Sequence, residues 1–140
     1  MGLLTSLSLS LGVAIVGQWQ FYKMEYRGNE LPPRDPNLVL TYEFTEDMKS
    51  HMLWYYKNDL KHRCERRGEY EYQNEVLSDT ATWINPENHI SCSQDPDMRL
   101  GTVSVAPLVR HENGDLYMKL PFNGEFLYYV WKRTDLEDNQ

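Results

Sequence analysis

The sequence predicts an all-β protein in which about eight antiparallel strands close into an up-and-down barrel. After Gly17, short runs rich in aromatic and β-branched residues recur about every ten residues, with turn residues between them. No segment after Gly17 has the period of a long helix. An open sheet of this size would leave unpaired edges, which favours a barrel, and a sandwich with crossing connections is the alternative.

The length and charge of the chain narrow the classes of partner. Its 140 residues suit a single hydrophobic core, and 14 Lys and Arg against 21 Asp and Glu give a formal net charge of −7. Nucleic-acid binding relies on clustered cations. We therefore expect no nucleic-acid partner and no binding to anionic lipid surfaces.

Residues 1–16 form an apolar N-terminal segment, and Leu3 to Val16 carries no charge. This run is shorter than the roughly 20 residues that a membrane-spanning helix needs. Its length and the small residues Gly12 to Ala14 are typical of a secretory signal peptide, although no Lys or Arg precedes it. The alternative is an ordered segment that covers the barrel. We expect an extracytoplasmic protein, periplasmic or secreted, without a membrane span.

The first strands are predicted between Gln18 and Lys57. Gln18 to Arg27 is the first aromatic run, and the three prolines of residues 28–37 exclude a central strand there. In the run from Leu38 to Phe44, alternate residues are apolar, which is the period of a strand with one buried face. Lys49 to Lys57 returns after a tight connection and completes a hairpin.

The middle of the chain is more polar. A charged run from Lys61 to Arg67 leads into a strand from Gly68 to Tyr72. Ser78 and Asp79 have turn chemistry, which places the next strand at Thr80 to Ile84. Glu87 to Asp97 has no clear period, and we expect a loop or a weak edge strand there.

Three further runs predict the last strands: Leu100 to Leu108, Leu116 to Leu120 and Glu125 to Arg133. Asn113-Gly114 and Asn123-Gly124 lie between them, and Asn-Gly is the strongest short hairpin signal because both residues tolerate positive φ. The last run is apolar or aromatic on both faces, so its outer face needs a cover.

Short motifs resemble those of lipocalins and their calycin relatives. Gly17-Gln18-Trp19 resembles the GxW motif, and Tyr128 to Arg133 resembles the close of the last strand in small bacterial lipocalin-like domains. Tyr42 to Asp47 resembles the Y-x-F-x-x-D hairpin of that group. The resemblance covers residues 17–133 and implies a lipocalin-like barrel. The polar tail, 134–140, is too short to be the helix that follows the barrel in classical lipocalins.

The resemblance also implies how one end of the barrel is closed. In such domains the first-strand Trp plugs that end, and a basic residue of the last strand lies across its ring. This implies barrel-closing roles for Gly17, Trp19 and Arg133. A guanidinium over an indole is a favourable cation–π pair, and we therefore assign the role to Arg133 rather than Lys132.

A barrel of this size either is filled by side chains or holds one small ligand. Ten Tyr and four Trp against four Phe favour a pocket for an amphipathic or aromatic molecule. We expect non-catalytic binding or transport of a small hydrophobic or amphipathic ligand. A protein-interaction or inhibitor module with a filled core is the alternative. The candidate ligand-binding residues are Leu40, Tyr42, Phe44, Trp54, Tyr56, Tyr70, Tyr72, Trp83, Met118 and Tyr128.

The sequence offers no pattern typical of catalysis. Its four histidines are scattered over separate predicted elements, and no nucleophile motif accompanies them, so we expect no catalytic residue, no metal site and no cofactor. Cys64 and Cys92 are too far apart for a CxxC motif. They would form a disulfide in an exported protein, and two free thiols are the alternative.

Overall fold

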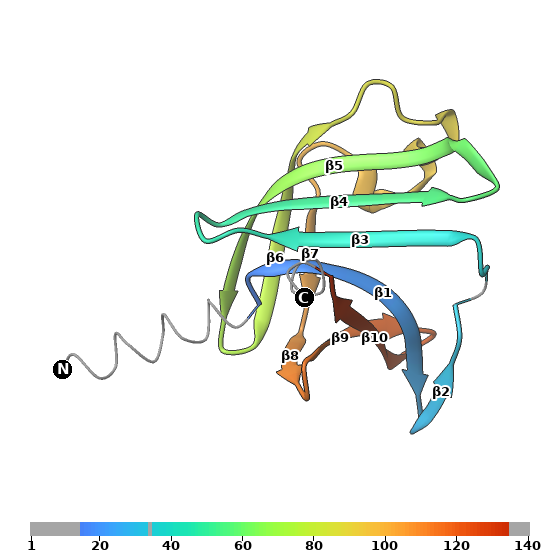
Figure 1. Ribbon diagram of the computed structural model, residues 1–140. Coiled ribbons are helices and arrows are strands. Elements are labelled where there is room, and N and C mark those ends of the chain that lie inside the picture. The colour runs from blue at the N-terminus through green and yellow to red at the C-terminus, as the bar shows by residue number, and fades with distance from the viewer. Residues whose placement is uncertain (1–14, 34, 135–140) are drawn as a thin grey trace.

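Ten strands in one antiparallel sheet make up most of residues 15–33 and 35–134, which the computed structural model describes (Figure 1). The strands are β1 (Gly17–Tyr26), β2 (Asn29–Leu31), β3 (Leu38–Phe44), β4 (Lys49–Tyr56), β5 (Asp59–Gln73), β6 (Val76–Ile84), β7 (Val103–Ala106), β8 (Leu108–Glu112), β9 (Asp115–Phe122) and β10 (Glu125–Arg133). Two short 3-10 helices, η1 (Ile90–Gln94) and η2 (Pro96–Met98), lie between β6 and β7.

The sheet curls into a nearly closed barrel with the strand order β7-β6-β5-β4-β3-β1-β10-β9-β8. The first and last strands are paired neighbours, with Trp19 opposite Arg133. β7 and β8, at the two ends of this order, are joined in sequence through Pro107, which has no N–H to donate to a neighbouring strand. The N–H of Val109 donates to the carbonyl of Glu75 at 2.7 Å, which ties β8 to the β5–β6 turn.

These observations confirm the predicted all-β, antiparallel up-and-down barrel. The structure has ten strands rather than about eight, and two features explain the difference. β2 pairs only with β1, outside the path of the barrel. β7 and β8 are consecutive stretches interrupted at Pro107, and together they replace one predicted strand.

Two-residue turns with positive φ at both positions connect four of the hairpins. They include the two predicted Asn-Gly turns, with φ of 55° and 84° at Asn113-Gly114. Positive φ at both residues gives a turn twist that matches the twist of the flanking strands. Asn74-Glu75 is another such turn, and the turn predicted at Ser78-Asp79 is wrong because both residues lie within β6.

β5 is longer than predicted because the charged run is itself part of the strand. Burial alternates from Cys64 to Tyr72, so every second residue faces the interior. The alternation places most charges of the run outside but puts Arg66 inside.

The segment predicted as a loop or edge strand, Glu87 to Asp97, contains η1 and most of η2. Residues 1–14 and 135–140 lie outside the described residues, and with them most of the predicted signal peptide or cover and most of the predicted tail. Within the described residues, no helix is long and apolar enough to cross a membrane.

Candidate ligand-binding cavity

Trp19 closes one end of the barrel. Its side chain is fully buried, and its Nε1 donates to the carbonyl of Ile15 at 2.9 Å. The Arg133 guanidinium lies over the indole, 4.4 Å from the ring centre, and Nη1 donates to the carbonyl of Val16 at 3.0 Å. Gly17 lies in the chain between Val16, which accepts from Arg133, and Trp19. It has a φ of 145°, which residues with a side chain rarely adopt. Lys132 lies instead over Tyr22.

Aromatic side chains fill the interior next to Trp19. Phe44 packs against Tyr42 and Tyr70, with ring centres 4.4 and 5.0 Å away. The hydroxyls of Tyr70 and Tyr72 donate to the backbone carbonyls of Thr45 and Val109, each at 2.6 Å. The hydroxyls of Tyr70 and Tyr72 therefore have backbone partners within the protein, and this end is packed without a ligand.

The other part of the barrel holds a cavity of about 640 Å³. This volume lies within the range of about 300 to 1,000 Å³ that is typical of small-molecule sites. Most of its lining is apolar, with side chains from β3 to β7, from β9 and β10, and from η2. The aliphatic part of the lining consists mainly of Leu38, Leu40, Met52, Leu77, Met118 and Leu120. Its aromatic part includes Trp54, Tyr56, Tyr129 and Trp131.

The structure divides the predicted ligand-binding residues into three groups. The first group lines the cavity: Leu40, Tyr42, Trp54, Tyr56 and Met118. The second belongs to the buried aromatic cluster beside Trp19 and does not line the cavity: Phe44, Tyr70 and Tyr72. The third faces outward: Trp83 and Tyr128.

Strand geometry explains why the side chains of Tyr128 and Trp83 point outward. On β10 it is Tyr129 that lines the cavity, and its neighbour Tyr128 necessarily points to the other face. On β6 the pairing with β5 shifts by one residue between Gly68 and Arg67, so that Arg67 is opposite Trp83. Such a bulge reverses the alternation. Trp83 is consequently exposed, with the Arg67 guanidinium 5.9 Å from its ring centre.

A buried polar network that the sequence analysis missed lies at the cavity wall. Arg66 on β5 and Asp79 on β6 are each 1% exposed, and Arg66 Nη2 donates to Asp79 Oδ2 at 3.1 Å. The Tyr42 hydroxyl donates to the same carboxylate oxygen. The Ser50 hydroxyl donates to the other oxygen, Oδ1, at 2.7 Å. The charge of Arg66 is thereby balanced inside the barrel.

Asp79 influences the pKa of Tyr42 and lies so close to Gly68 that a side chain there would not fit. Burial and the Asp79 carboxylate raise the pKa of Tyr42 well above its ordinary value, so its hydroxyl keeps the proton that it donates. A Cβ at Gly68 would lie 2.7 Å from Asp79 Oδ1, 2.7 Å from Ser50 Oγ and 2.6 Å from the carbonyl of Thr80. The absence of a side chain at Gly68 therefore lets the network form.

Three buried donors of the cavity lining remain without an acceptor. Within the described residues, Arg66 Nε, Arg66 Nη1 and Trp131 Nε1 have no hydrogen-bond partner. Both side chains line the cavity, and both contact Tyr42. One sequence signal could have located Arg66, because the alternation of Tyr72, Tyr70 and Gly68 places it on the same strand face.

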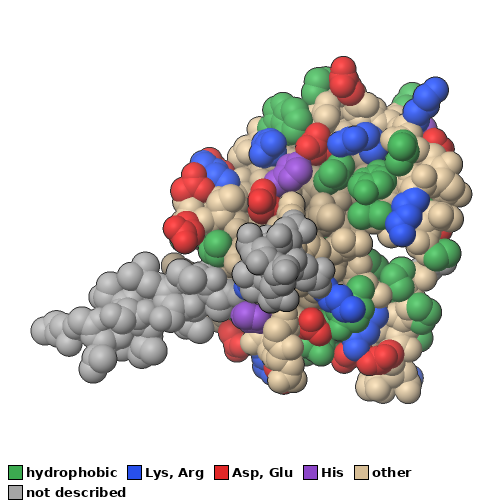
Figure 2. All heavy atoms as spheres, viewed as in Figure 1, with side chains coloured by type: hydrophobic (Ala, Val, Ile, Leu, Met, Phe, Trp, Pro, Cys, Tyr) green, Lys and Arg blue, Asp and Glu red, His purple; other side chains and the backbone are tan. Residues whose placement is uncertain are grey.

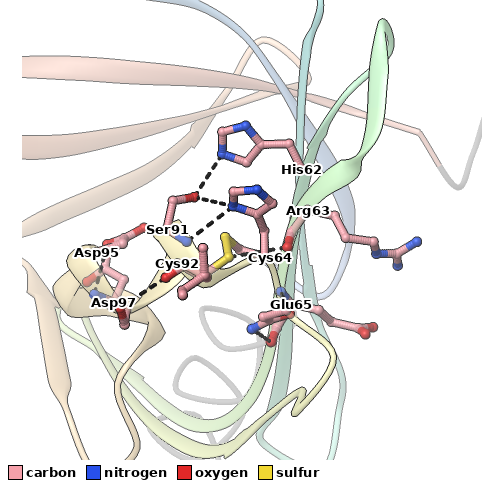
Figure 3. Close-up of a disulfide and its surroundings, with 12 residues drawn as sticks. His62, Arg63, Cys64, Glu65, Ser91, Cys92, Asp95 and Asp97 are labelled. Carbon is pink, nitrogen blue, oxygen red and sulfur yellow. Dashed lines mark hydrogen bonds between the residues drawn. A yellow bond between two sulfur atoms is a disulfide. The ribbon is translucent and has the colours of Figure 1, made fainter.

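A disulfide anchors the segment that lines another side of the cavity (Figure 3). Cys64 on β5 and Cys92 on η1 are bonded, which confirms the predicted pair. Asp95 and Asp97, which follow Cys92, line the cavity. Burial raises the pKa of Asp95, partly opposed by hydrogen bonds from the Asp97 N–H and Trp54 and by the charge of Arg66.

Two histidines lie beside the disulfide. The rings of His62 and His89 stack with centres 4.4 Å apart, and Ser91 Oγ lies 2.8 Å from His89 Nδ1. Ser91 Oγ also lies 3.0 Å from His62 Nε2 (Figure 3). His62 also packs against Tyr56, which lines the cavity. Across residues 15–33 and 35–134, no three His, Cys, Asp or Glu side chains form a group that could hold a metal ion.

On the outer surface, Figure 2 shows acidic and basic side chains intermingled over the face in view. Surface pairs of this kind include Lys49 with Glu69 and Arg27 with Glu125, each at 2.7 Å. On this face, therefore, charges of opposite sign are interspersed rather than separated.

Comparison with proteins of known structure identifies the fold to which this chain is similar. No protein-family model matches the sequence, and no curated protein matches it. A crystal structure of a lipocalin-like protein from Bacteroides uniformis is similar, with a TM-score of 0.56 and 14% identity over 86% of this chain and 99% of that one. A structure of an uncharacterized protein from Bacteroides eggerthii is similar with a TM-score of 0.50 and 16% identity, at the same coverage. With its GxW motif at the closed end, this chain therefore has a lipocalin-like fold.

Proposed function

We propose that the protein binds one small hydrophobic or amphipathic molecule inside its barrel. The observation that carries this proposal is the cavity of about 640 Å³ with its mainly apolar lining. A protein-interaction or inhibitor module with a filled core is less well supported, because the strands around the cavity do not fill it.

We propose further that the molecule is carried and not transformed. The polar groups at the cavity wall are bonded to one another, as in the contacts of Asp79 with Arg66 and Ser50. The Ser104 hydroxyl donates to Asp97 at 2.7 Å, and no histidine is among the described lining residues. Within the described lining, therefore, no imidazole lies beside a hydroxyl to act as its base, as it does in Ser–His pairs.

The Cys64–Cys92 disulfide supports a location outside the cytoplasm. Disulfides persist in oxidising compartments and are rare where glutathione and thioredoxin keep thiols reduced. We therefore propose that binding takes place in the periplasm or after secretion, where a carrier would meet molecules that enter or leave the cell.

Probe binding to matched variants tests the proposal. The uncharged dye N-phenyl-1-naphthylamine should bind the folded protein with increased fluorescence. Leu120→Trp fills part of the cavity and should weaken binding about tenfold or more, whereas Lys119→Trp, one residue along β9 and absent from the lining, should leave it unchanged. Native mass spectrometry after incubation with a cell extract should then find a retained small molecule of unchanged mass. A folded protein that binds neither dye nor metabolite would contradict the proposal.

A further inference from the structure

We propose that the inner end of the ligand is an uncharged hydrogen-bond acceptor, such as a ketone, ester or amide oxygen, held by Arg66 and Trp131. This inference rests on the proposed function and specifies the chemical class of its ligand. It also predicts that the site discriminates against carboxylates such as free fatty acids.

The unpartnered donors of the lining supply the first part of the argument. Arg66 is 1% exposed and Trp131 is 2% exposed, yet Arg66 Nε, Arg66 Nη1 and Trp131 Nε1 have no partner within the described residues. Buried N–H groups are nearly always paired, because an unpaired one loses its hydrogen bonds to water. An acceptor brought by a ligand would satisfy them.

These donors belong to two side chains that both contact Tyr42 and both line the cavity. The Arg66 guanidinium lies 5.9 Å from the centre of the Tyr42 ring, and the Trp131 ring lies 5.7 Å from it. All three side chains line the cavity. Around them the lining is aliphatic, from Leu77 and Met118 among others, so a ligand would contact donors at one end and hydrocarbon along its body.

The charge balance decides between a neutral acceptor and an anion. Asp79 already neutralises Arg66, and each of its carboxylate oxygens accepts a hydrogen bond from a further hydroxyl, that of Tyr42 or Ser50. The acidic groups of the lining itself, Asp95 and Asp97, are of the same sign as a ligand carboxylate. A carboxylate would therefore lose its hydration beside three carboxyl groups and one cation that is already paired.

An uncharged oxygen avoids this repulsion. It can accept from the free N–H groups of Arg66 and Trp131 without a net charge entering the cavity. A hydrocarbon with no acceptor would leave the donors unpaired, so the site should rank a ketone above both the carboxylate and the hydrocarbon of equal length.

Competition against N-phenyl-1-naphthylamine at pH 7.5 tests this order with 2-decanone, decanoate and 1-decene. We expect 2-decanone to bind about tenfold more tightly than either competitor. Trp131→Phe keeps most of the ring but removes Nε1–H, and should reduce the advantage of 2-decanone over 1-decene severalfold while the dye still binds. The double variant Arg66→Met with Asp79→Asn removes the other donors without leaving a buried charge and should reduce it again.

The outcomes separate the two proposals. If the dye binds but decanoate equals or exceeds 2-decanone, or if neither variant changes the preference for the ketone, the acceptor subsite is wrong and the carrier function stands. If neither the dye nor any competitor binds the folded wild-type protein, both proposals fail. Urea unfolding of each variant verifies that a lost preference comes from a folded protein, and the double variant decides the matter should Trp131→Phe not fold.

Discussion

At one end of the barrel the interior is filled by rings around Trp19, whereas farther along the same strands a cavity of about 640 Å³ remains. The difference is clearest in the polar atoms. Trp19 Nε1 and the hydroxyls of Tyr70 and Tyr72 all donate to backbone carbonyls of the protein. At the cavity, Arg66 and Trp131 keep donors for which the described residues offer no acceptor.

The comparison separates stability from binding along one barrel. The packed end satisfies its own hydrogen bonds, so loss of a side chain there removes contacts that nothing replaces. At the cavity end, N–H groups of Arg66 and Trp131 have no acceptor among the described residues. Truncation of an apolar side chain should therefore lower the free energy of unfolding more at the packed end than at the cavity, where only the buried ion pair of Arg66 and Asp79 should contribute as much.

Trp19→Ala should give one of the two largest effects, a loss of about 3 to 5 kcal/mol in the free energy of unfolding. It removes a fully buried indole together with its bonds to the Ile15 carbonyl and to Arg133. Leu120→Ala, next to the cavity, should lose only about 1 to 2 kcal/mol because fewer atoms pack against it. Urea unfolding curves measure both, and equal losses would show that the two ends do not differ in packing.

Asp79→Asn should lower the free energy of unfolding by about 3 to 5 kcal/mol, since it leaves the Arg66 guanidinium buried and unbalanced. This tests whether the polar wall of the cavity contributes to stability as well as to binding. Glu69→Gln is the control, because its bond to Lys49 is exposed and should contribute less than about 1 kcal/mol. Similar denaturation midpoints for the two variants would contradict the buried pair.

Replacing Cys64 and Cys92 by Ser should lower the free energy of unfolding by about 2 to 4 kcal/mol, because the bridge restricts the unfolded chain over a separation of 28 residues. The bridge anchors the segment that carries Asp95 and Asp97, so dye affinity should fall as well. Thiol titration of the denatured, unreduced wild type should find no free thiol. Two free thiols would reject the bridge.

Arg133→Gln should lower the free energy of unfolding by about 1 to 2 kcal/mol through loss of its cation–π contact with Trp19. The neighbouring Lys132→Gln makes a matched control, because Lys132 is exposed over Tyr22 and should contribute about 0.5 kcal/mol or less. Thermal unfolding of both variants compares the two cations. An equal loss from both would remove the special role of the closed end.

The smallest expected effect is a pH dependence at the closed end. Burial and the charge of Arg133 lower the pKa of His111 from its ordinary 6.5, and its ring lies 5.5 Å from that of Trp19. The unfolded chain then binds the proton more readily, so this contribution to stability is present above pH 6.5 and is lost as the pH falls through the folded-state pKa. His111→Gln should make the melting temperature less sensitive to acid, and an unchanged slope would contradict this.

The sequence was sufficient to predict the barrel because its strands follow simple rules. The alternation of Leu38 to Phe44 and the two Asn-Gly turns are local signals, and the structure has a strand and two turns at those positions. The Gly17-Gln18-Trp19 motif lies at the start of β1, and Trp19 is buried. Each of these signals depends on neighbours in sequence.

The cavity was less predictable because its features depend on pairing between strands. Trp83 has the right spacing for the interior, but a bulge opposite Arg67 turns it outward. Arg66 lies in a run of charges that resembles a solvated surface, and only its partner Asp79, 13 residues away, makes its burial favourable. Which of the neighbouring residues Tyr128 and Tyr129 lines the cavity likewise depends on the register of β10.

The interruption at Pro107 has a consequence for how the barrel is closed. β7 takes its register from β6, and β8 takes its register from β9, so no ladder of paired residues fixes β7 against β8. Along this line the barrel is closed by the chain itself at Pro107 and by the hydrogen bond from the Val109 N–H to the Glu75 carbonyl. Val103 to Ala106 line the cavity, so the least extensively paired part of the barrel is also part of the cavity wall.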